Sequence, residues 1–158
     1  MQVFYLEQTV DLLNQILSTH LAEVLRYTQY SLLASGYDKL SIANLFTELA
    51  SESLRQAQAI GKILTAMNEQ PKLAIPSFGE PMQQSVQEMS TQEMLLRSLH
   101  QERQALALNR ALLQNAQKLN YHLEQLADSM LLHAEAKTRK LMYQLNEQEV
   151  SVCLSLSA

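Results

Sequence analysis

Three glutamates, Glu23, Glu52 and Glu102, lie on the apolar faces of three separate helical segments of the sequence. Glu23, for example, is seven residues from both Ile16 and Tyr30, so the three side chains share one helical face. A buried carboxylate without a partner costs several kcal/mol of stability. If these faces are buried, a cation must lie among the carboxylates, and it is either a metal ion or a basic side chain.

Two basic residues share these inner faces. Arg55 follows Glu52 by about one helical turn, and Lys137 lies on one line with Ala134 and Leu141. We expect five charged side chains from four helices to converge near the middle of a bundle. Arginine only donates hydrogen bonds, and lysine ligates a metal only after losing its proton, so neither is an ordinary metal ligand. In the alternative interpretation each glutamate is solvated, as most helical glutamates are.

The composition is typical of a single all-helical domain. The chain has 158 residues, with three glycines, three prolines and no tryptophan. Its formal net charge is −4 and it has no basic cluster, so no nucleic-acid partner is expected. No apolar run approaches the roughly 20 residues that span a bilayer, and no signal peptide is recognisable, so we expect a cytoplasmic protein without membrane contact. The lone Cys153 excludes an internal disulfide and a cysteine metal cluster.

Apolar periodicity predicts four helices, over residues 9–35, 41–68, 91–117 and 120–145. Ser90 with Glu93 forms a capping box for the third helix, and Asn120 can cap the fourth. All three prolines lie in the connection between the second and third helices. A connection of about 20 residues reaches about 66 Å, which exceeds the roughly 42 Å of a 28-residue helix. The sequence therefore predicts an antiparallel four-helix bundle with one long crossover.

The last segment, residues 146–158, has a different pattern. Its apolar residues alternate with mostly small polar ones, which is the period of a strand. We nevertheless expect the tail to be disordered. In the alternative interpretation the tail docks onto a neighbouring subunit or serves as an address tail.

An ordered set of short segments carries a family resemblance that covers roughly Leu12 to Leu145. The segments are Leu13-Asn14-Gln15, Leu21-Ala22-Glu23, Gln29-Tyr30, Leu45 to Leu64 with Glu52, Glu93-Met94-Leu95-Leu96-Arg97 followed by Glu102, and Tyr143-Gln144-Leu145. Together they resemble the bacterioferritins of the ferritin-like superfamily. The resemblance implies the four-helix ferritin fold, iron storage and a di-iron ferroxidase centre held between the helices.

The resemblance also implies that the di-iron centre is degenerate. Glu23, Glu52 and Glu102 match ligand positions of the family. Arg55 and Lys137 stand where the family has histidines, and a further glutamate position is held by Ala134. Three carboxylates and two cations leave a net charge of only −1. We therefore expect Arg55 and Lys137 to fill the cation positions with a salt-bridge network, as in storage chains of the family that lack a ferroxidase centre.

Two alternatives retain some metal chemistry. The three glutamates could hold a residual or distorted metal site. Sliding the fourth helix by one residue would bring Glu135 toward the missing carboxylate position, with His133 just before it. Neither alternative restores the family's full ligand set.

Other family positions extend these expectations. Tyr30 is expected to pack in the core and to hydrogen-bond the charged cluster. A haem site is not expected, because Ser53 stands where the family has its haem-ligating methionine. The remaining histidines lack the Glu-x-x-His spacing and are expected at the surface or at an interface; they are His20, His100, His122 and His133.

The function implied by the resemblance is that of an iron-storage subunit with a lost or impaired di-iron site. Such a chain is a weak or inactive ferroxidase, and iron would be present as stored mineral. It would assemble through dimers into a cage, either as a homo-oligomer or as a hetero-oligomer with an active bacterioferritin subunit. The alternative is a helical scaffold or interaction protein that kept the ferritin fold and handles no metal.

Overall fold

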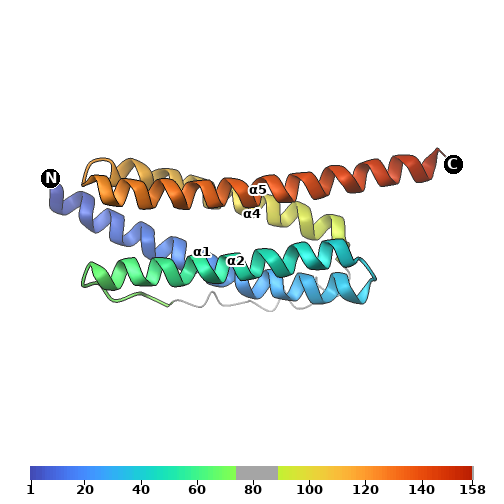
Figure 1. Cartoon of the computed structure of the whole chain (residues 1–158), viewed down its shortest axis with the longest axis horizontal. Coiled ribbons are helices and arrows are strands. Elements are labelled where there is room, and N and C mark those ends of the chain that lie inside the picture. Colours follow the sequence, from blue (N-terminus) through green and yellow to red (C-terminus); the bar gives the residue numbers. More distant parts are fainter. Residues whose placement is uncertain (74–88, 158) are drawn as a thin grey trace.

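The structure, a computed structural model, describes residues 1–73 and 89–157. Within these ranges the chain forms four helices and no strand: α1 (Gln2–Gly36), α2 (Leu40–Ala66), α4 (Thr91–Ala116) and α5 (Tyr121–Leu156). The first two helices form one hairpin and the last two form another, and α1 packs against α4 between them (Figure 1). The predicted all-helical bundle is therefore confirmed.

Helices α2 and α4 run in the same direction, because the chain leaves α2 at one end of the bundle and enters α4 at the other (Figure 1). The predicted long crossover is therefore present, although residues 74–88 lie outside the described ranges. The predicted caps are also present. The Ser90 hydroxyl accepts from the Glu93 amide at 3.2 Å, and the Asn120 side chain accepts from the Leu123 amide at 2.9 Å.

Two helices are longer than predicted. Helix α1 begins at Gln2 instead of residue 9, and its first turns are held where Lys118 lies over the Tyr5 ring, 4.6 Å from the ring centroid. Helix α5 continues to Leu156 instead of ending at residue 145. The prediction of a disordered or strand-like tail is wrong, because residues 120–158 contain no glycine or proline that would stop the helix.

The apolar core has two parts. One is formed by residues that include Tyr27, Tyr30, Ala34, Phe46, Leu49, Met94, Leu95, Leu99 and Leu141. The other is formed by residues that include Leu13, Ile16, Leu17, Ala57, Ile60, Leu64, Leu112, Ala127 and Met130. On each helix at least one buried polar residue falls between the two parts, and these residues include Glu23, Ser53, Glu102 and Lys137. The fold thus brings four polar side chains to the middle of the bundle.

Candidate functional site

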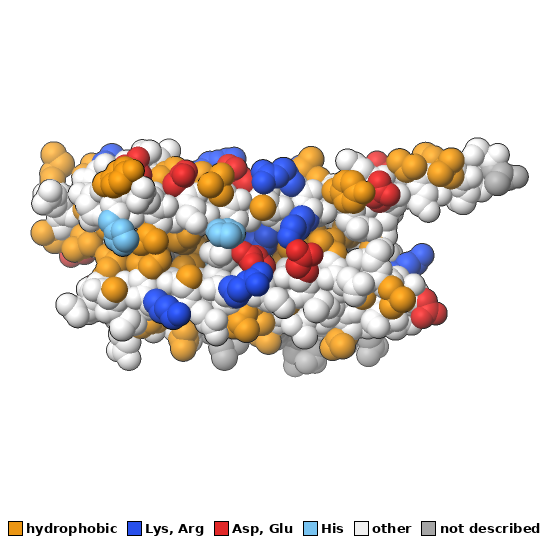
Figure 2. Space-filling view, in the orientation of Figure 1, with side chains coloured by type: hydrophobic (Ala, Val, Ile, Leu, Met, Phe, Trp, Pro, Cys, Tyr) orange, Lys and Arg blue, Asp and Glu red, His pale blue; other side chains and the backbone are white. Residues whose placement is uncertain are grey.

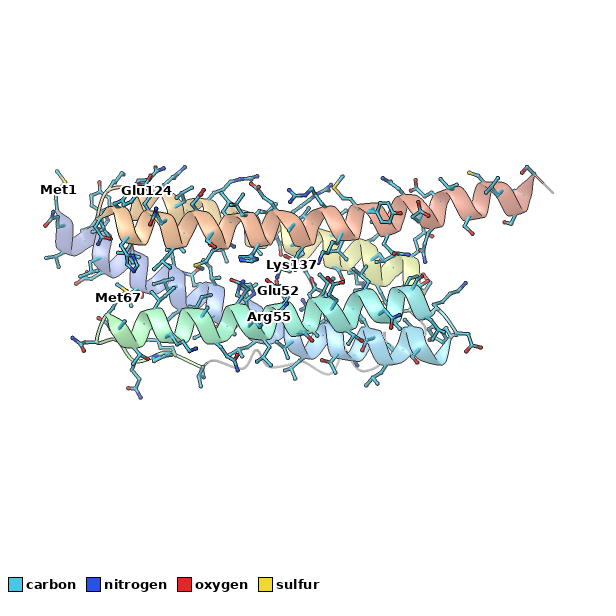
Figure 3. All side chains as sticks on the ribbon, viewed as in Figure 1. Met1, Glu52, Arg55, Met67, Glu124 and Lys137 are labelled. Carbon is cyan, nitrogen blue, oxygen red and sulfur yellow. The ribbon has the colours of Figure 1, made fainter. Side chains whose placement is uncertain are left out.

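Lys137 lies at the centre of the buried polar residues. Its side chain is 2% exposed, and its ammonium Nζ lies 2.6 Å from Glu23 Oε2 and 3.3 Å from Glu102 Oε1. It also donates to the Ser53 hydroxyl at 3.4 Å. Figure 3 shows Lys137 directed from α5 into the space between the helices. One ammonium group therefore connects side chains from all four helices.

Glu23 is held in its charged form. Its Oε2 atom accepts hydrogen bonds from Lys137 and from Ser53, the latter at 2.7 Å, and it lies 3.1 Å from Nδ1 of His20. Burial alone would raise the pKa of Glu23. Attraction to Lys137 and the contact with His20 outweigh burial and hold the pKa of this carboxyl well below its usual range. Glu23 and Lys137 thus form a buried ion pair.

Glu102 differs from Glu23 although both are buried. Burial and repulsion from Glu23 raise the pKa of Glu102 to about 8, against the opposing effects of Lys137 and of the Tyr27 hydroxyl, which donates to Oε1. Glu102 is therefore mostly protonated at neutral pH. With one carboxylate, one ammonium and one carboxylic acid, the buried group is then neutral without a metal ion.

The proton on Glu102 gives a pH-dependent prediction. Between the ordinary carboxyl pKa of 4.5 and about 8, the unfolded chain has lost this proton and the folded chain keeps it, so Glu102 lowers the stability as pH rises. A glutamine side chain at the same position does not titrate. We expect Glu102→Gln to gain stability relative to the parent by a few kcal/mol as pH rises across this window. Urea unfolding of both proteins at the low and the high end of the pH window would measure the difference. An equal stability difference at both ends would contradict the proton assignment.

A second charged group lies at the surface between α2 and α5. The Arg55 guanidinium donates to Glu52 Oε2 through two nitrogens, and Oε1 of the same carboxylate lies 3.1 Å from Nδ1 of His133. Burial raises the pKa of Glu52, but hydrogen bonds from Arg55 and Gln56 outweigh it and lower the pKa overall. Figure 2 shows charged side chains gathered along this boundary near the middle of the molecule.

The prediction that Arg55 enters the interior is therefore wrong. Its side chain is 69% exposed, whereas that of Glu52 is 17% exposed. The long arginine side chain pairs with Glu52 while its guanidinium stays hydrated, which removes the need to bury a second cation. The five charged residues expected in one cluster thus form two groups, one around Lys137 and one around Glu52.

Two buried partners of the site were missed or misplaced. His20 was expected at the surface, but it is 5% exposed and contacts Glu23. The hydroxyl that donates to Glu102 belongs to Tyr27, whereas Tyr30 packs against the Phe46 ring at 5.2 Å. Both His20 and Tyr27 could have been predicted as neighbours of Glu23, because residues three or four positions from Glu23 share its helical face.

The remaining candidates are placed as follows. Ala134 is 3% exposed, and Glu135 at the next position is only partly buried, so the shifted register of the fourth helix is not the one observed. Ser53 is buried and hydrogen-bonded to Glu23. His100, His122 and His133 lie at the surface.

A di-iron centre of the family kind requires carboxylate and imidazole lone pairs directed at two metal ions. The residues present do not fit it. An ammonium donates to Glu23, the Ala134 side chain has no donor atom, and Arg55 points outward. Among residues 1–73 and 89–157, no three His, Cys, Asp or Glu side chains are grouped so that they could hold a metal ion.

The ferritin-like domain family matches residues 10–149, and the chain belongs to this family. Among solved structures, a bacterioferritin from Rhodobacter capsulatus superposes on this chain with a TM-score of 0.79. The match covers 90% of this chain and 86% of the bacterioferritin chain. That protein is described with a metal-free dinuclear site and a haem iron. The two sequences are only 18% identical, so the likeness shows a shared fold. No curated protein matches the sequence.

Proposed function

We propose that this chain is a bacterioferritin-like iron-storage subunit in which Lys137 takes the place of the metal ions between Glu23 and Glu102. The observation that carries the proposal is the buried ammonium, which lies within 4 Å of a carboxyl oxygen of both Glu23 and Glu102. An ion entering this space would have to displace the ammonium from Glu23. The subunit is therefore a weak or inactive ferroxidase, and its iron is stored mineral instead of a resident di-iron centre.

The charges of the neighbouring groups support the same proposal. One ammonium supplies less positive charge than two metal ions, so the negative charge around it must also be smaller. Ala134 contributes no charge, Glu102 keeps a proton, and Glu52 pairs with Arg55 and His133 away from Lys137. These three features reduce the negative charge to what one lysine can neutralise.

The fold has a surface suited to assembly with other ferritin subunits. Leu25, Leu32 and Leu54 on α1 and α2 have exposed fractions of 47%, 70% and 44%. A recess of ≈ 820 Å³ opens between the same helices. Exposed apolar surface of this kind marks protein contacts. We propose a dimer-based cage, alone or with an active bacterioferritin subunit that oxidises Fe(II) for both.

The proposal includes no haem site. Ser53 stands where the family has its haem-ligating methionine, and its hydroxyl is buried and donates to Glu23, so there is no sulfur ligand at this position. None of the described helices is long and apolar enough to span a bilayer. We propose a cytoplasmic location.

The proposal is tested by measuring Fe(II) oxidation and iron uptake by the full chain, alone and after co-assembly with an active bacterioferritin subunit. We expect the chain alone to oxidise Fe(II) no faster than buffer, and the mixed assembly to store iron. Native pulldown with mass spectrometry should recover a ferritin-type partner. Rapid oxidation by the chain alone would contradict the inactive site. If no partner is recovered and no assembly stores iron, the scaffold alternative is correct.

A further inference from the structure

Helix α5 carries a row of side chains along its outer side, and we call this row the α5 stripe. Its members recur every three or four residues, which places them on one side of the helix. They are Leu132, Ala136, Arg139, Tyr143, Glu147, Val150 and Leu154. All of them are exposed except Ala136, which is partly buried. The four large apolar side chains of the stripe have exposed fractions of 56% to 65%.

The α5 stripe continues past the end of the bundle. Figure 1 shows α5 extending beyond the other helices, and Figure 2 shows hydrophobic side chains spaced along it. The Gln148 side chain donates to the Thr91 hydroxyl at 3.3 Å, and we call residues 149–156 beyond this contact the C-terminal overhang. Short helical segments without packing partners are only marginally stable in water. The C-terminal overhang therefore calls for a surface outside this chain.

The α5 stripe is symmetric about Tyr143. Residues at equal distances before and after Tyr143 match in type, or carry opposite charges. The matching pairs are Leu132 with Leu154, Ala136 with Val150, and Arg139 with Glu147. The outermost pair lies eleven residues from Tyr143 on either side, which is close to three full helical turns, so the stripe runs nearly straight along the helix. Such a stripe is complementary to a second copy of itself in the reverse direction.

The two charged members of the α5 stripe determine that direction. Within residues 1–73 and 89–157, neither the Arg139 nor the Glu147 side chain has an ion-pair or hydrogen-bond partner. If two α5 helices lie antiparallel and meet at Tyr143, Arg139 of each copy lies opposite Glu147 of the partner subunit. A parallel pair would instead place like charges opposite each other. Charge complementarity therefore favours the antiparallel pair.

We propose that two copies of this chain pair through their α5 stripes, antiparallel and with Tyr143 on the two-fold axis. The C-terminal overhang of each copy then lies along the partner's stripe between Leu132 and Tyr143, which covers its apolar side chains. The same surface is used on both copies, so the contact closes on two subunits. It supplies pairs of the kind that a dimer-based cage requires and leaves the apolar surface on α1 and α2 for other contacts. The pairing does not depend on the iron chemistry of the chain.

Disulfide cross-linking of the full chain tests the two-fold axis. All variants carry Cys153→Ser, which removes the only cysteine. A disulfide requires Cα atoms within about 7 Å, so one cysteine links two antiparallel helices only where they meet. We expect Tyr143→Cys to form covalent dimers several-fold faster than the control Met142→Cys. Position 142 is 43% exposed but lies about 100° around the helix. Equal rates for the two variants would overturn the proposal.

Cysteines at the two ends of the α5 stripe test the antiparallel direction. In the proposed pair, Leu132 lies opposite Leu154 of the partner subunit and about 33 Å from the partner's Leu132. Co-expressed copies with Leu132→Cys and with Leu154→Cys should therefore link to each other, whereas copies with Leu132→Cys alone should not link. The absence of mixed dimers, or equally fast linking by Leu132→Cys alone, would overturn the proposal.

A charge exchange in the Tyr143→Cys background gives an independent readout. Arg139→Glu or Glu147→Arg alone should slow the cross-linking several-fold, because each change places like charges opposite each other twice in the pair. The two changes together should restore the rate. Circular dichroism of each variant establishes that the helices are intact. Two single losses without rescue would overturn the proposal, and none of these outcomes bears on iron uptake.

Discussion

Replacing Lys137 with methionine is expected to destabilise the bundle by about 3–5 kcal/mol, the usual effect of removing one partner of a buried ion pair. Methionine fills much of the same volume but leaves the Glu23 carboxylate without a cation. Ser53 and His20 still contact that carboxylate, but the strongest attraction that keeps Glu23 charged, that of Lys137, is lost. Urea unfolding at neutral pH, followed by circular dichroism, measures the loss as a lower transition midpoint.

Two matched variants separate this effect from a general loss of charge. Arg55→Met removes a cation whose side chain is 69% exposed, so we expect a change of at most about 1 kcal/mol. Adding Glu23→Gln to Lys137→Met should recover much of the lost stability, because no unpaired charge then remains. Equal losses for Arg55→Met and Lys137→Met, or no recovery in the double variant, would contradict the buried ion pair.

The triple variant Arg55→His, Ala134→Glu and Lys137→His is expected to gain measurable Fe(II) oxidation. It removes the ammonium from Glu23 and supplies the lone pairs that the residues present lack. We expect the initial oxidation rate to exceed that of the parent at least about tenfold, which corresponds to about 1.4 kcal/mol in the activation barrier. Absorbance of the ferric product under aerobic conditions gives the rate.

The control for this gain is the variant with Arg55→His alone, which keeps the ammonium between Glu23 and Glu102 and should remain at the parent rate. A correctly folded triple variant without any gain would show that Ala134 and Lys137 are not at the ligand positions. The assignment of residues on the fourth helix to the family's ligand positions would then be wrong, whereas the four-helix fold would be unaffected.

The parts of the fold that could be predicted from sequence are those with local signals. Ser90 and Asn120 fix the starts of two helices through side-chain caps, and the three prolines mark the crossover. The ends near Gln2 and Leu156 could not be placed, because no residue there stops or starts a helix by itself. Whether a terminal helix continues depends on packing, such as the contact between Tyr5 and Lys118.

The site was predictable only where a residue's direction follows from helical periodicity. The inward position of Lys137 follows from its line with Ala134 and Leu141, and it is buried in the structure. Arg55 sits one turn after Glu52, but its long side chain reaches water from a position near the inner face. Periodicity gives the direction of the Cα–Cβ bond and not the rotamer. It could therefore not predict that Arg55 and Glu52 form a surface group separate from the buried group around Lys137.

Crystals of the full chain grown with excess Fe(II) and measured at the iron absorption edge give the most direct test that Lys137 takes the place of the metal ions. We predict no anomalous peak between Glu23 and Glu102, with the Lys137 ammonium still within salt-bridge distance of Glu23. An iron peak ligated by Glu23, Glu52 and Glu102, with Lys137 displaced, would contradict the proposal.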